Sequence, residues 1–213
     1  MMRVLDLFCG AGGAGAGYAR AGFEVVGVDL RPMPRYPFEF HQADALEYVA
    51  EHGHEFDLIH SSPPCQAHMR LRHWTKKEYP DLVEPTRAAL LATGKPYVIE
   101  NVPDAPLIEP VMLCGSMFGL RVIRHRIFET SARIAFPPAT CSHPRGAVGR
   151  RGNEGTREWI TVTGHFSGVA KAQQAMGIDW MSQAELAQAI PPAYTEWIGT
   201  CMRDMLEPGD PQW

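Results

Sequence analysis

The stretch that decides the fold is Val4-Leu5-Asp6-Leu7-Phe8-Cys9-Gly10-Ala11-Gly12-Gly13-Ala14-Gly15-Ala16-Gly17, close to the start of the chain. Its first five residues are mostly apolar, which predicts a short buried β-strand. The glycines that follow let the backbone turn tightly and approach a ligand without interference from a Cβ atom. A helix is predicted from Tyr18 onwards, so strand, glycine-rich loop and helix form the first unit of an α/β fold.

The pattern Gly10-x-Gly12-x-x-Gly15 satisfies the dinucleotide-binding fingerprint, because Asp29 ends the next predicted strand, residues 24–28, about 20 residues later. An acid in that position binds ribose hydroxyls. Nicotinamide dinucleotides and S-adenosylmethionine both carry an adenosine ribose, so the fingerprint leaves both cofactors open. Asp44 precedes a further predicted helix, where it can cap the helix or accept a hydrogen bond from an adenine amino group.

A second informative stretch, Ser61-Ser62-Pro63-Pro64-Cys65-Gln66, follows a predicted buried strand at residues 56–60. The two prolines remove backbone donors and hold the chain extended, so the strand ends there and Cys65 is presented in a fixed direction. In open α/β sheets, ligands bind beyond the carboxyl ends of the strands. We therefore interpret Cys65 as a candidate nucleophile; the alternative is a buried structural cysteine.

Glu100 ends another predicted strand, residues 97–99, and is expected at the same edge of the sheet as Cys65. Beside a nucleophile, such a carboxyl group is a general-acid candidate, although a plain surface acid has the same pattern. Residues 120–131 alternate in character and predict a strand with Arg124 and Arg126 on one face.

The chain of 213 residues is most simply one domain. We expect a catalytic and cofactor-binding core at 1–136, an irregular insertion at 137–168 with a short strand at 159–162, and C-terminal helices at 169–213 that complete the core. Helices are predicted at 80–93, 169–176, 182–189 and 193–205. No apolar run is long enough to span a membrane and the amino terminus lacks a signal-peptide pattern, so a cytoplasmic protein is expected.

The net charge is −4, but eight arginines and only two glutamates lie within residues 121–157. This excess predicts a phosphate-facing patch, with a solvated arginine-rich loop as the alternative. The five cysteines include no CxxC pair, so no disulfide framework is expected. Cys141-x-His143 can be combined with Cys114 or His165 into a zinc site, but paired ligand spacing is missing and no metal site is predicted.

Taken together, these motifs resemble the DNA cytosine-5 methyltransferase family, in a small form with a reduced target-recognition region. Residues 6–13 are similar to its cofactor signature, and Pro63-Pro64-Cys65-Gln66 is similar to its nucleophile motif. Glu100-Asn101-Val102 and Arg124-x-Arg126 resemble the motifs that supply its acid and its paired arginines. Residues 174–179 resemble the motif before its last helix. The motifs follow one another in family order.

The resemblance implies a Rossmann-like S-adenosylmethionine-dependent methyltransferase fold, α/β in class, with a mostly parallel central sheet and a short irregular insertion. It implies S-adenosylmethionine as cofactor, S-adenosylhomocysteine as product, and double-stranded DNA with a flipped cytosine as partner. Implied cofactor contacts are Asp6, Phe8, Cys9, Gly10, Ala11, Gly12, Gly13, Asp29, Leu30, Asp44, Ala45, Pro64 and Leu82. Implied catalytic residues are Cys65, Glu100, Arg124 and Arg126. Nucleic-acid contacts are expected at Gln66, Arg70, Arg72, Lys76, Arg145, Arg150 and Arg151.

The resemblance also implies a mechanism. The Cys65 thiolate adds to carbon 6 of cytosine, which lets carbon 5 attack the sulfonium methyl group. Glu100 donates a proton to N3, Arg126 holds O2 and Arg124 steadies the site. The base must first leave the double helix, which costs a few kcal/mol.

Two departures from the family pattern bear on this interpretation. Ala189-Ile190-Pro191-Pro192 stands where Gly-Asn-Ser-Val is usual, and the insertion is so short that a partner protein for target recognition stays an open alternative. An RNA (tRNA) cytosine-5 methyltransferase would use the same catalytic residues. A nicotinamide dehydrogenase leaves the Pro-Pro-Cys-Gln and Glu-Asn-Val strand ends unexplained. A non-catalytic methyltransferase-like DNA-binding protein has no need of Cys65, Glu100 and Arg126 together.

Overall fold

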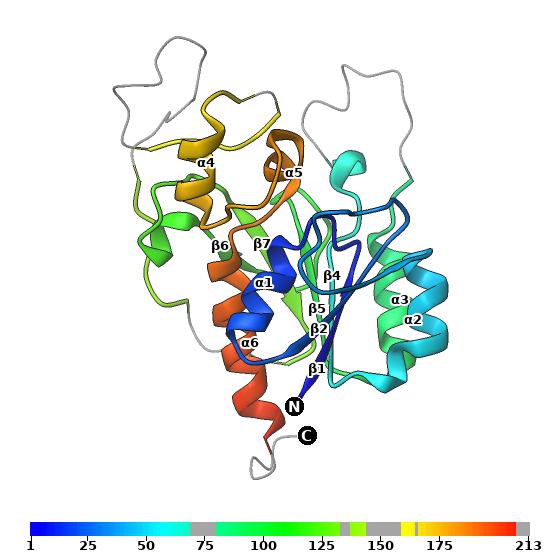
Figure 1. The fold of residues 1–213 in the computed structure, drawn as a ribbon. Helices are drawn as coiled ribbons and strands as arrows, with labels where there is room; N and C mark the ends of the chain where they lie inside the picture. The colour runs from blue at the N-terminus through cyan, green and yellow to red at the C-terminus, as the bar shows by residue number, and fades with distance from the viewer. Residues whose placement is uncertain (69–79, 133–136, 144–158, 165, 208–213) are drawn as a thin grey trace.

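A computed structural model of the protein describes residues 1–68, 80–132, 137–143, 159–164 and 166–207. One seven-stranded sheet, in the order β3-β2-β1-β4-β5-β7-β6, runs through the molecule with helices on both faces (Figure 1). The strands are β1 Arg3–Leu7, β2 Glu24–Asp29, β3 Glu39–Gln42, β4 Leu58–Ser61, β5 Tyr97–Asn101, β6 Val111–Leu113 and β7 Arg126–Thr130. The helices are α1 Gly13–Arg20, α2 Ala45–His52, α3 Val83–Thr93, α4 Val169–Met176, α5 Gln183–Gln188 and α6 Pro192–Leu206.

The first five strands are parallel, and β7 is antiparallel to both of its neighbours, β5 and β6. This topology confirms the predicted α/β methyltransferase class with a mostly parallel sheet. Because the parallel strands all point the same way, their carboxyl ends form one edge of the sheet. The antiparallel β7 brings its amino-terminal residue, Arg126, to that same edge. Among the residues described, no helix is both long and apolar enough to cross a membrane.

Alternation along the strands builds a core on each face of the sheet. Val4 and Leu58 pack toward α1 and α6, whereas their neighbours Leu5 and Ile59 pack toward α2 and α3. Figure 1 shows these two helix pairs on opposite sides of the sheet. Successive side chains of a strand point to opposite faces, so a strand covered on both faces is apolar throughout.

Helix α1 begins at Gly13 and not at Tyr18, so the prediction of its start was wrong. The glycine-rich run was interpreted as a loop because glycines let the backbone turn tightly and approach a ligand. The close packing of α1 against α6 explains the difference, because a Cβ atom on Gly17 would overlap the Thr195 hydroxyl. Small residues are therefore needed inside this helix, and tertiary packing overrides the local preference.

The strand predicted at 120–131 was also partly wrong. Only Arg126–Thr130 is strand, and the short β6 was missed. The residues before Arg126 lie beside the segment predicted as strand at 159–162. The two segments are joined by a single parallel bridge between Val122 and Ile160. Hydrogen bonds from Ile123 N to the Ile160 carbonyl (2.8 Å) and from Ile160 N to the Arg121 carbonyl (3.0 Å) connect the two segments. The alternating pattern of residues 120–125 therefore reflects the burial of Val122 and Arg124 outside the sheet.

A buried ion pair joins α3 to β7. Arg87 Nε and Nη2 donate to the two Glu129 carboxylate oxygens at 2.8 and 2.7 Å. The Arg87 side chain is 5% exposed and the Glu129 side chain 4%. Tyr97 Oη and Ile108 N also donate to this carboxylate, at 3.3 and 2.8 Å. Burial is the largest single effect and raises the pKa of Glu129, but the Arg87 hydrogen bonds and charge, together with the Ile108 and Tyr97 hydrogen bonds, outweigh it and lower the pKa.

Glu129→Ala is expected to reduce the free energy of unfolding by about 3–5 kcal/mol, because Arg87 then keeps a buried charge without its main partner. Urea denaturation at neutral pH measures this. Glu84→Ala is the matched control, since Glu84 also pairs with Arg87 but has a 74% exposed side chain; its expected cost is about 1 kcal/mol or less. Equal losses in the two variants would contradict the prediction.

The same pair predicts a pH dependence. Because the pKa of Glu129 is depressed in the folded state, its contribution to stability is complete above the unfolded pKa and is lost as the pH falls through the folded value. We expect wild-type stability to fall more steeply on acidification than that of Glu129→Ala.

Candidate active site

The glycine-rich loop after β1 closes against the acid at the end of β2. Gly10 N donates to Asp29 Oδ2 at 3.1 Å, and Arg31 N donates to Asp29 Oδ1 at 3.0 Å. Gly10 and Gly12 have φ angles of +51° and +86°, in the left-handed region that favours glycine. Asp29 is thereby held directly beside the loop, as the fingerprint predicted.

Asp6 lies beneath this loop. Its side chain is fully buried, and Tyr36 Oη donates to Asp6 Oδ2 at 3.1 Å. Burial raises the pKa of Asp6 to about 8, so the carboxyl group is largely protonated at neutral pH. A Cβ atom on Gly27 would overlap the Tyr36 ring, so the absence of a side chain there makes room for the tyrosine. This geometry favours a supporting role for Asp6 behind the loop.

Asp44 caps helix α2, which confirms that interpretation of the sequence. Its Oδ1 accepts hydrogen bonds from Leu46 N (2.8 Å) and Glu47 N (3.1 Å), and the side chain is otherwise exposed. Asp29 is the last residue of β2, and Asp44 follows the carboxyl end of the neighbouring parallel strand β3. An adenine contact at Asp44 stays a prediction.

The other residues predicted to contact the cofactor surround this edge. Phe8 is half-buried with a φ of +54°, and Ala45 is the buried first residue of α2. Cys9 and Ala11 are buried in the loop and Gly13 is the buried first residue of α1, while Leu30 is 68% exposed. Pro64 and Leu82 are half-buried, the latter at the start of α3.

The C-terminal part of the chain supports the glycine-rich loop from behind. Trp180 Nε1 donates to the Ala11 carbonyl at 2.8 Å, and Thr195 Oγ1 donates to the Ala14 carbonyl at 2.8 Å. A Cβ atom on Gly13 would lie 2.7 Å from the Ile190 carbonyl oxygen. Ala189-Ile190-Pro191-Pro192, the stretch that departs from the family pattern, therefore lies against the loop.

Cys65, Glu100 and Arg126 meet at the ends of three neighbouring strands, β4, β5 and β7. Arg126 Nε lies 3.0 Å from Glu100 Oε1, and these side chains are 15% and 9% exposed. The ion pair is close but poorly aligned, so Glu100 Oε1 receives no well-directed hydrogen bond from the described residues. A buried carboxylate oxygen in this state is suited to a ligand that brings its own donor.

Cys65 begins the 3₁₀ turn η2 (Cys65–His68), is half-buried and is not disulfide bonded. Burial raises the pKa of its thiol, the Arg126 charge opposes that rise, and the Glu100 charge adds to it. The three groups are thus close enough for their charges to influence one another. Arg126 is the cation that favours the reactive thiolate most, and Arg124 acts in the same direction.

Asn101 is a site residue that the sequence analysis missed. Its Nδ2 donates to the Pro63 carbonyl at 3.0 Å and its Oδ1 accepts from Val102 N at 2.9 Å, with only 1% of the residue exposed. It therefore ties the turn that carries Cys65 to the end of β5. Its place directly after Glu100 was the only signal in the sequence.

His60 was missed as well. Its Nδ1 lies 3.0 Å from Tyr18 Oη and its Nε2 lies 3.0 Å from Ser62 Oγ. Burial lowers the pKa of His60 to about 3, so the ring is neutral at physiological pH. This chain of hydrogen bonds links α1 to the start of the Pro63-Pro64-Cys65 turn.

Arg124 is buried and binds the protein itself. Its Nη1 donates to the Val162 carbonyl and its Nη2 to the Ala187 carbonyl at 3.0 Å, while Tyr194 Oη donates to the Arg124 carbonyl at 2.7 Å. Burial lowers its pKa to about 9. The guanidinium group joins the start of β7 to α5 and to the 159–162 segment, which is the geometry of a positioning residue.

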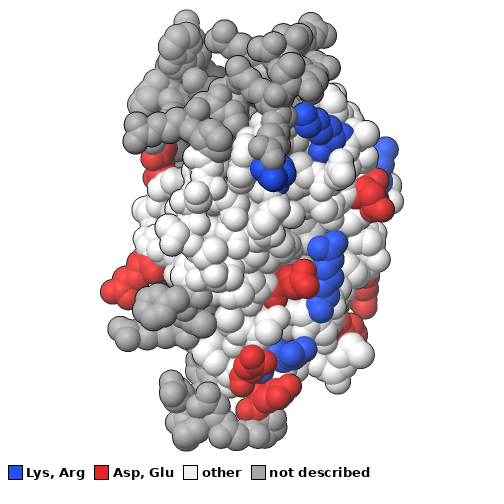
Figure 2. All heavy atoms as spheres, turned by 90° about the vertical axis from the view of Figure 1, so that its left-hand side faces the viewer, with Lys and Arg blue, Asp and Glu red and all other residues white. Residues whose placement is uncertain are grey.

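The predicted nucleic-acid contacts fall largely outside the described part of the chain. Gln66 has a described backbone in η2, but its side chain is not described. The basic residues predicted to contact nucleic acid also lie outside the described residues: Arg70, Arg72, Lys76, Arg145, Arg150 and Arg151. On the face drawn in Figure 2, the described lysines and arginines are interspersed with aspartates and glutamates.

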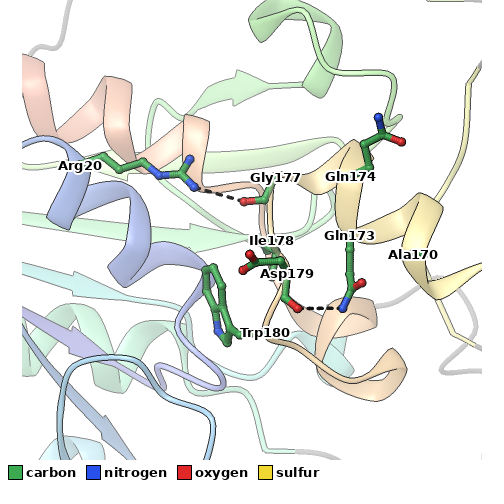
Figure 3. A pocket seen from close by; sticks show the side chains of 8 residues that line it. All are labelled: Arg20, Ala170, Gln173, Gln174, Gly177, Ile178, Asp179 and Trp180. Atoms are coloured by element: carbon green, nitrogen blue, oxygen red, sulfur yellow. Dashed lines mark hydrogen bonds between the residues drawn. The ribbon is translucent and has the colours of Figure 1, made fainter.

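A surface pocket of about 410 Å³ lies elsewhere, between α1 and α4 (Figure 3). Arg20 Nη2 donates to the Gly177 carbonyl at 3.2 Å across it, and Gln173 Nε2 donates to the Asp179 carbonyl at 3.0 Å. Its lining includes none of the predicted catalytic or cofactor residues. The candidate active site is therefore the edge that carries Asp29 and Cys65, not this pocket.

Comparison with known proteins supports the fold. A Dnmt2 methyltransferase structure from S. pombe matches with a TM-score of 0.66 at 12% identity, covering 97% of this chain and 100% of that chain. A structure described as a DNA modification methyltransferase encoded within an E. coli prophage matches with a TM-score of 0.60 at 13% identity, covering 97% and 99%. The Entamoeba histolytica methyltransferase EhMeth gives 0.60 at 11% identity, covering 97% and 99%.

No protein-family profile matches the chain, and no curated protein matches it in sequence. The likeness at these low identities is one of fold. The protein has the S-adenosylmethionine-dependent methyltransferase fold, in the form found in these DNA-modification and Dnmt2 methyltransferase structures.

Proposed function

We propose that this protein is an S-adenosylmethionine-dependent cytosine-5 methyltransferase that acts on nucleic acid in the cytoplasm, with double-stranded DNA as its substrate. The observation that carries the proposal is the meeting of Cys65, Glu100 and Arg126 at the ends of β4, β5 and β7. A nucleophile, a proton donor and a fixed cation are the groups that addition to a pyrimidine ring requires.

The residues at the neighbouring strand ends fit the proposed cofactor. Each Asp29 carboxylate oxygen accepts one backbone hydrogen bond, which leaves lone pairs for the hydroxyls of a ribose. Asp44 uses only Oδ1 for capping, so Oδ2 is available to an adenine amino group. S-adenosylmethionine bound here would supply an electrophilic methyl group. The glycine-rich loop and Phe8 would hold the rest of that molecule.

In the proposed reaction, Cys65 supplies the nucleophile. Its thiolate forms a bond to carbon 6 of cytosine while Glu100, in its protonated form, transfers a proton to N3, which keeps negative charge from accumulating on the ring. Carbon 5 then takes the methyl group. The carbon 5 proton is lost to water, the Cys65 sulfur departs and the N3 proton returns to Glu100, which restores the aromatic ring and the thiolate.

Arg126 has two tasks in this proposal. It favours the Cys65 thiolate through its charge, and it can donate to the O2 atom of the cytosine. Because its contact with Glu100 is not a well-aligned hydrogen bond, the pair keeps hydrogen-bonding capacity for an entering base. Asn101 and Arg124 position the backbones that carry these groups.

Transfer of a tritium-labelled methyl group tests the proposal. The purified protein is incubated with labelled S-adenosylmethionine and either duplex DNA or transfer RNA, and the labelled nucleoside is identified. 5-Methylcytosine in DNA supports the proposal. Label only in transfer RNA supports the RNA alternative, and label in neither supports a non-catalytic DNA-binding protein.

Asp29→Ala is expected to weaken S-adenosylmethionine binding at least tenfold, because each charge-assisted hydrogen bond to the ribose contributes about 1.5–3 kcal/mol. Isothermal titration calorimetry measures the change. Glu51→Ala, with a 78% exposed side chain near the other end of α2, is the control and should bind normally. Binding of NAD by the wild-type protein in place of S-adenosylmethionine would instead support the dehydrogenase alternative.

A further inference from the structure

Four potential metal ligands gather at the β6 and β7 edge of the sheet. Cys114 follows β6, and His125 immediately precedes Arg126, the first residue of β7. Cys141 and His143 come from the described segment 137–143. One ligand atom from each of the four residues lies within 4.8 Å of those of the other three.

Two of the six distances among these atoms are close to those of a tetrahedral site. His125 Nε2 lies 3.4 Å from Cys141 Sγ and 3.1 Å from His143 Nε2. Zinc bound at about 2.3 Å to sulfur and about 2.0–2.1 Å to nitrogen places tetrahedral ligand atoms about 3.3–3.8 Å apart. The observed spacings are within a few tenths of an ångström of this geometry.

The ligand types of the four groups suit a cation as well. Without a cation, His125 Nε2, His143 Nε2 and Cys141 Sγ lie close together with few protons available for hydrogen bonds among them. A divalent ion removes this conflict, because it binds neutral imidazoles and stabilises thiolates.

Neighbouring groups hold the sulfur of Cys141 in place. Ser116 Oγ lies 3.7 Å from Cys141 Sγ and also accepts a hydrogen bond from Ser142 N at 3.1 Å. Such outer contacts orient the ligands of natural metal sites. The Cys114 side chain is fully buried, so the cluster is closed on that side.

We propose that Cys114, His125, Cys141 and His143 bind one structural zinc ion. Four protein ligands complete a tetrahedral shell and leave no position for a substrate, so the role is structural. The ion would fasten the start of the 137–168 insertion to the backbone between Arg124 and Arg126. This inference does not depend on the proposed methyl transfer. It departs from our expectation of no metal site, which rested on sequence spacing alone.

The experiment measures metal content in protein purified under reducing conditions from zinc-supplemented cells. Mass spectrometry of the metal should find about one zinc per chain in the wild type. Cys141→Ser and His143→Asn should lose most of it. Cys201→Ser and His54→Asn are the controls, since they remove the same residue types outside the cluster and should retain the zinc.

Cobalt substitution gives a readout that needs no variant. Co²⁺ added to zinc-free wild-type protein should produce intense visible bands of a tetrahedral site and a thiolate charge-transfer band, and zinc should abolish both. Three results would overturn the proposal. They are folded wild-type protein without zinc above background, undiminished zinc in Cys141→Ser and His143→Asn, or a Cys114–Cys141 disulfide under reducing purification.

Discussion

Cys65→Ala is expected to abolish covalent capture of DNA and to reduce methyl transfer at least about a thousandfold, because the reaction loses its nucleophile. Duplex DNA that contains 5-fluorocytosine provides the direct measurement. Fluorine at carbon 5 cannot leave as a proton, so elimination stalls and the wild-type protein stays attached to the DNA through sulfur. A denaturing gel then separates the adduct from free protein.

The control for this experiment is Cys201→Ser, which alters a cysteine of α6 remote from the β4 and β5 strand ends and should form the adduct normally. In the wild type, the rate of adduct formation should rise with pH, since burial raises the pKa of the Cys65 thiol and higher pH increases the thiolate fraction. An adduct that persists in Cys65→Ala would show that another residue is the nucleophile.

Glu100→Gln is expected to lower the rate of methyl transfer by about 10²–10⁴-fold, the usual contribution of a general acid. The amide keeps the shape of the side chain but has no carboxylic proton to transfer to N3. Single-turnover transfer with saturating DNA and cofactor isolates this step. Cofactor affinity should be unchanged, because Glu100 lies on β5 and the proposed ribose and adenine acids follow β2 and β3.

Two controls sharpen this test. Glu84→Gln alters an exposed glutamate of α3 and should transfer at the wild-type rate. Asn101→Ala removes the hydrogen bond that positions the Cys65 turn and should slow both adduct formation and transfer, although it carries no proton for N3. If Glu100→Gln transfers at nearly the wild-type rate, some other group protonates the base.

The strand ends that carry Asp29, Cys65 and Glu100 were predictable because their signals are local. Asp29 and Glu100 directly follow short apolar runs, and Pro63-Pro64 marks the turn between such a run and Cys65. Such runs determine where a parallel strand ends, and the carboxyl ends of parallel strands lie at the same edge of the sheet. The order of motifs along the chain was therefore enough to predict the class of fold and the main polar groups of the site.

The contacts among these groups were not predictable in the same way. Arg124 and Arg126 were expected on one face of a strand, but Arg126 contacts Glu100 whereas Arg124 turns inward to the Ala187 carbonyl. Sequence periodicity cannot distinguish these outcomes, because both arginines have the same local pattern. Only the placement of α5 against the start of β7 separates them.

The sequence alone determined the strand–loop–helix succession and the chemical groups at the strand ends, since these depend on neighbouring residues. The tertiary structure decided which groups meet. The antiparallel β7 beside β5 brings Arg126 to Glu100, and the β6–β7 edge gathers Cys114 and Cys141 with two histidines. These contacts join residues far apart in the chain, and their geometry is set by packing of the whole sheet, which no local pattern of residue types records.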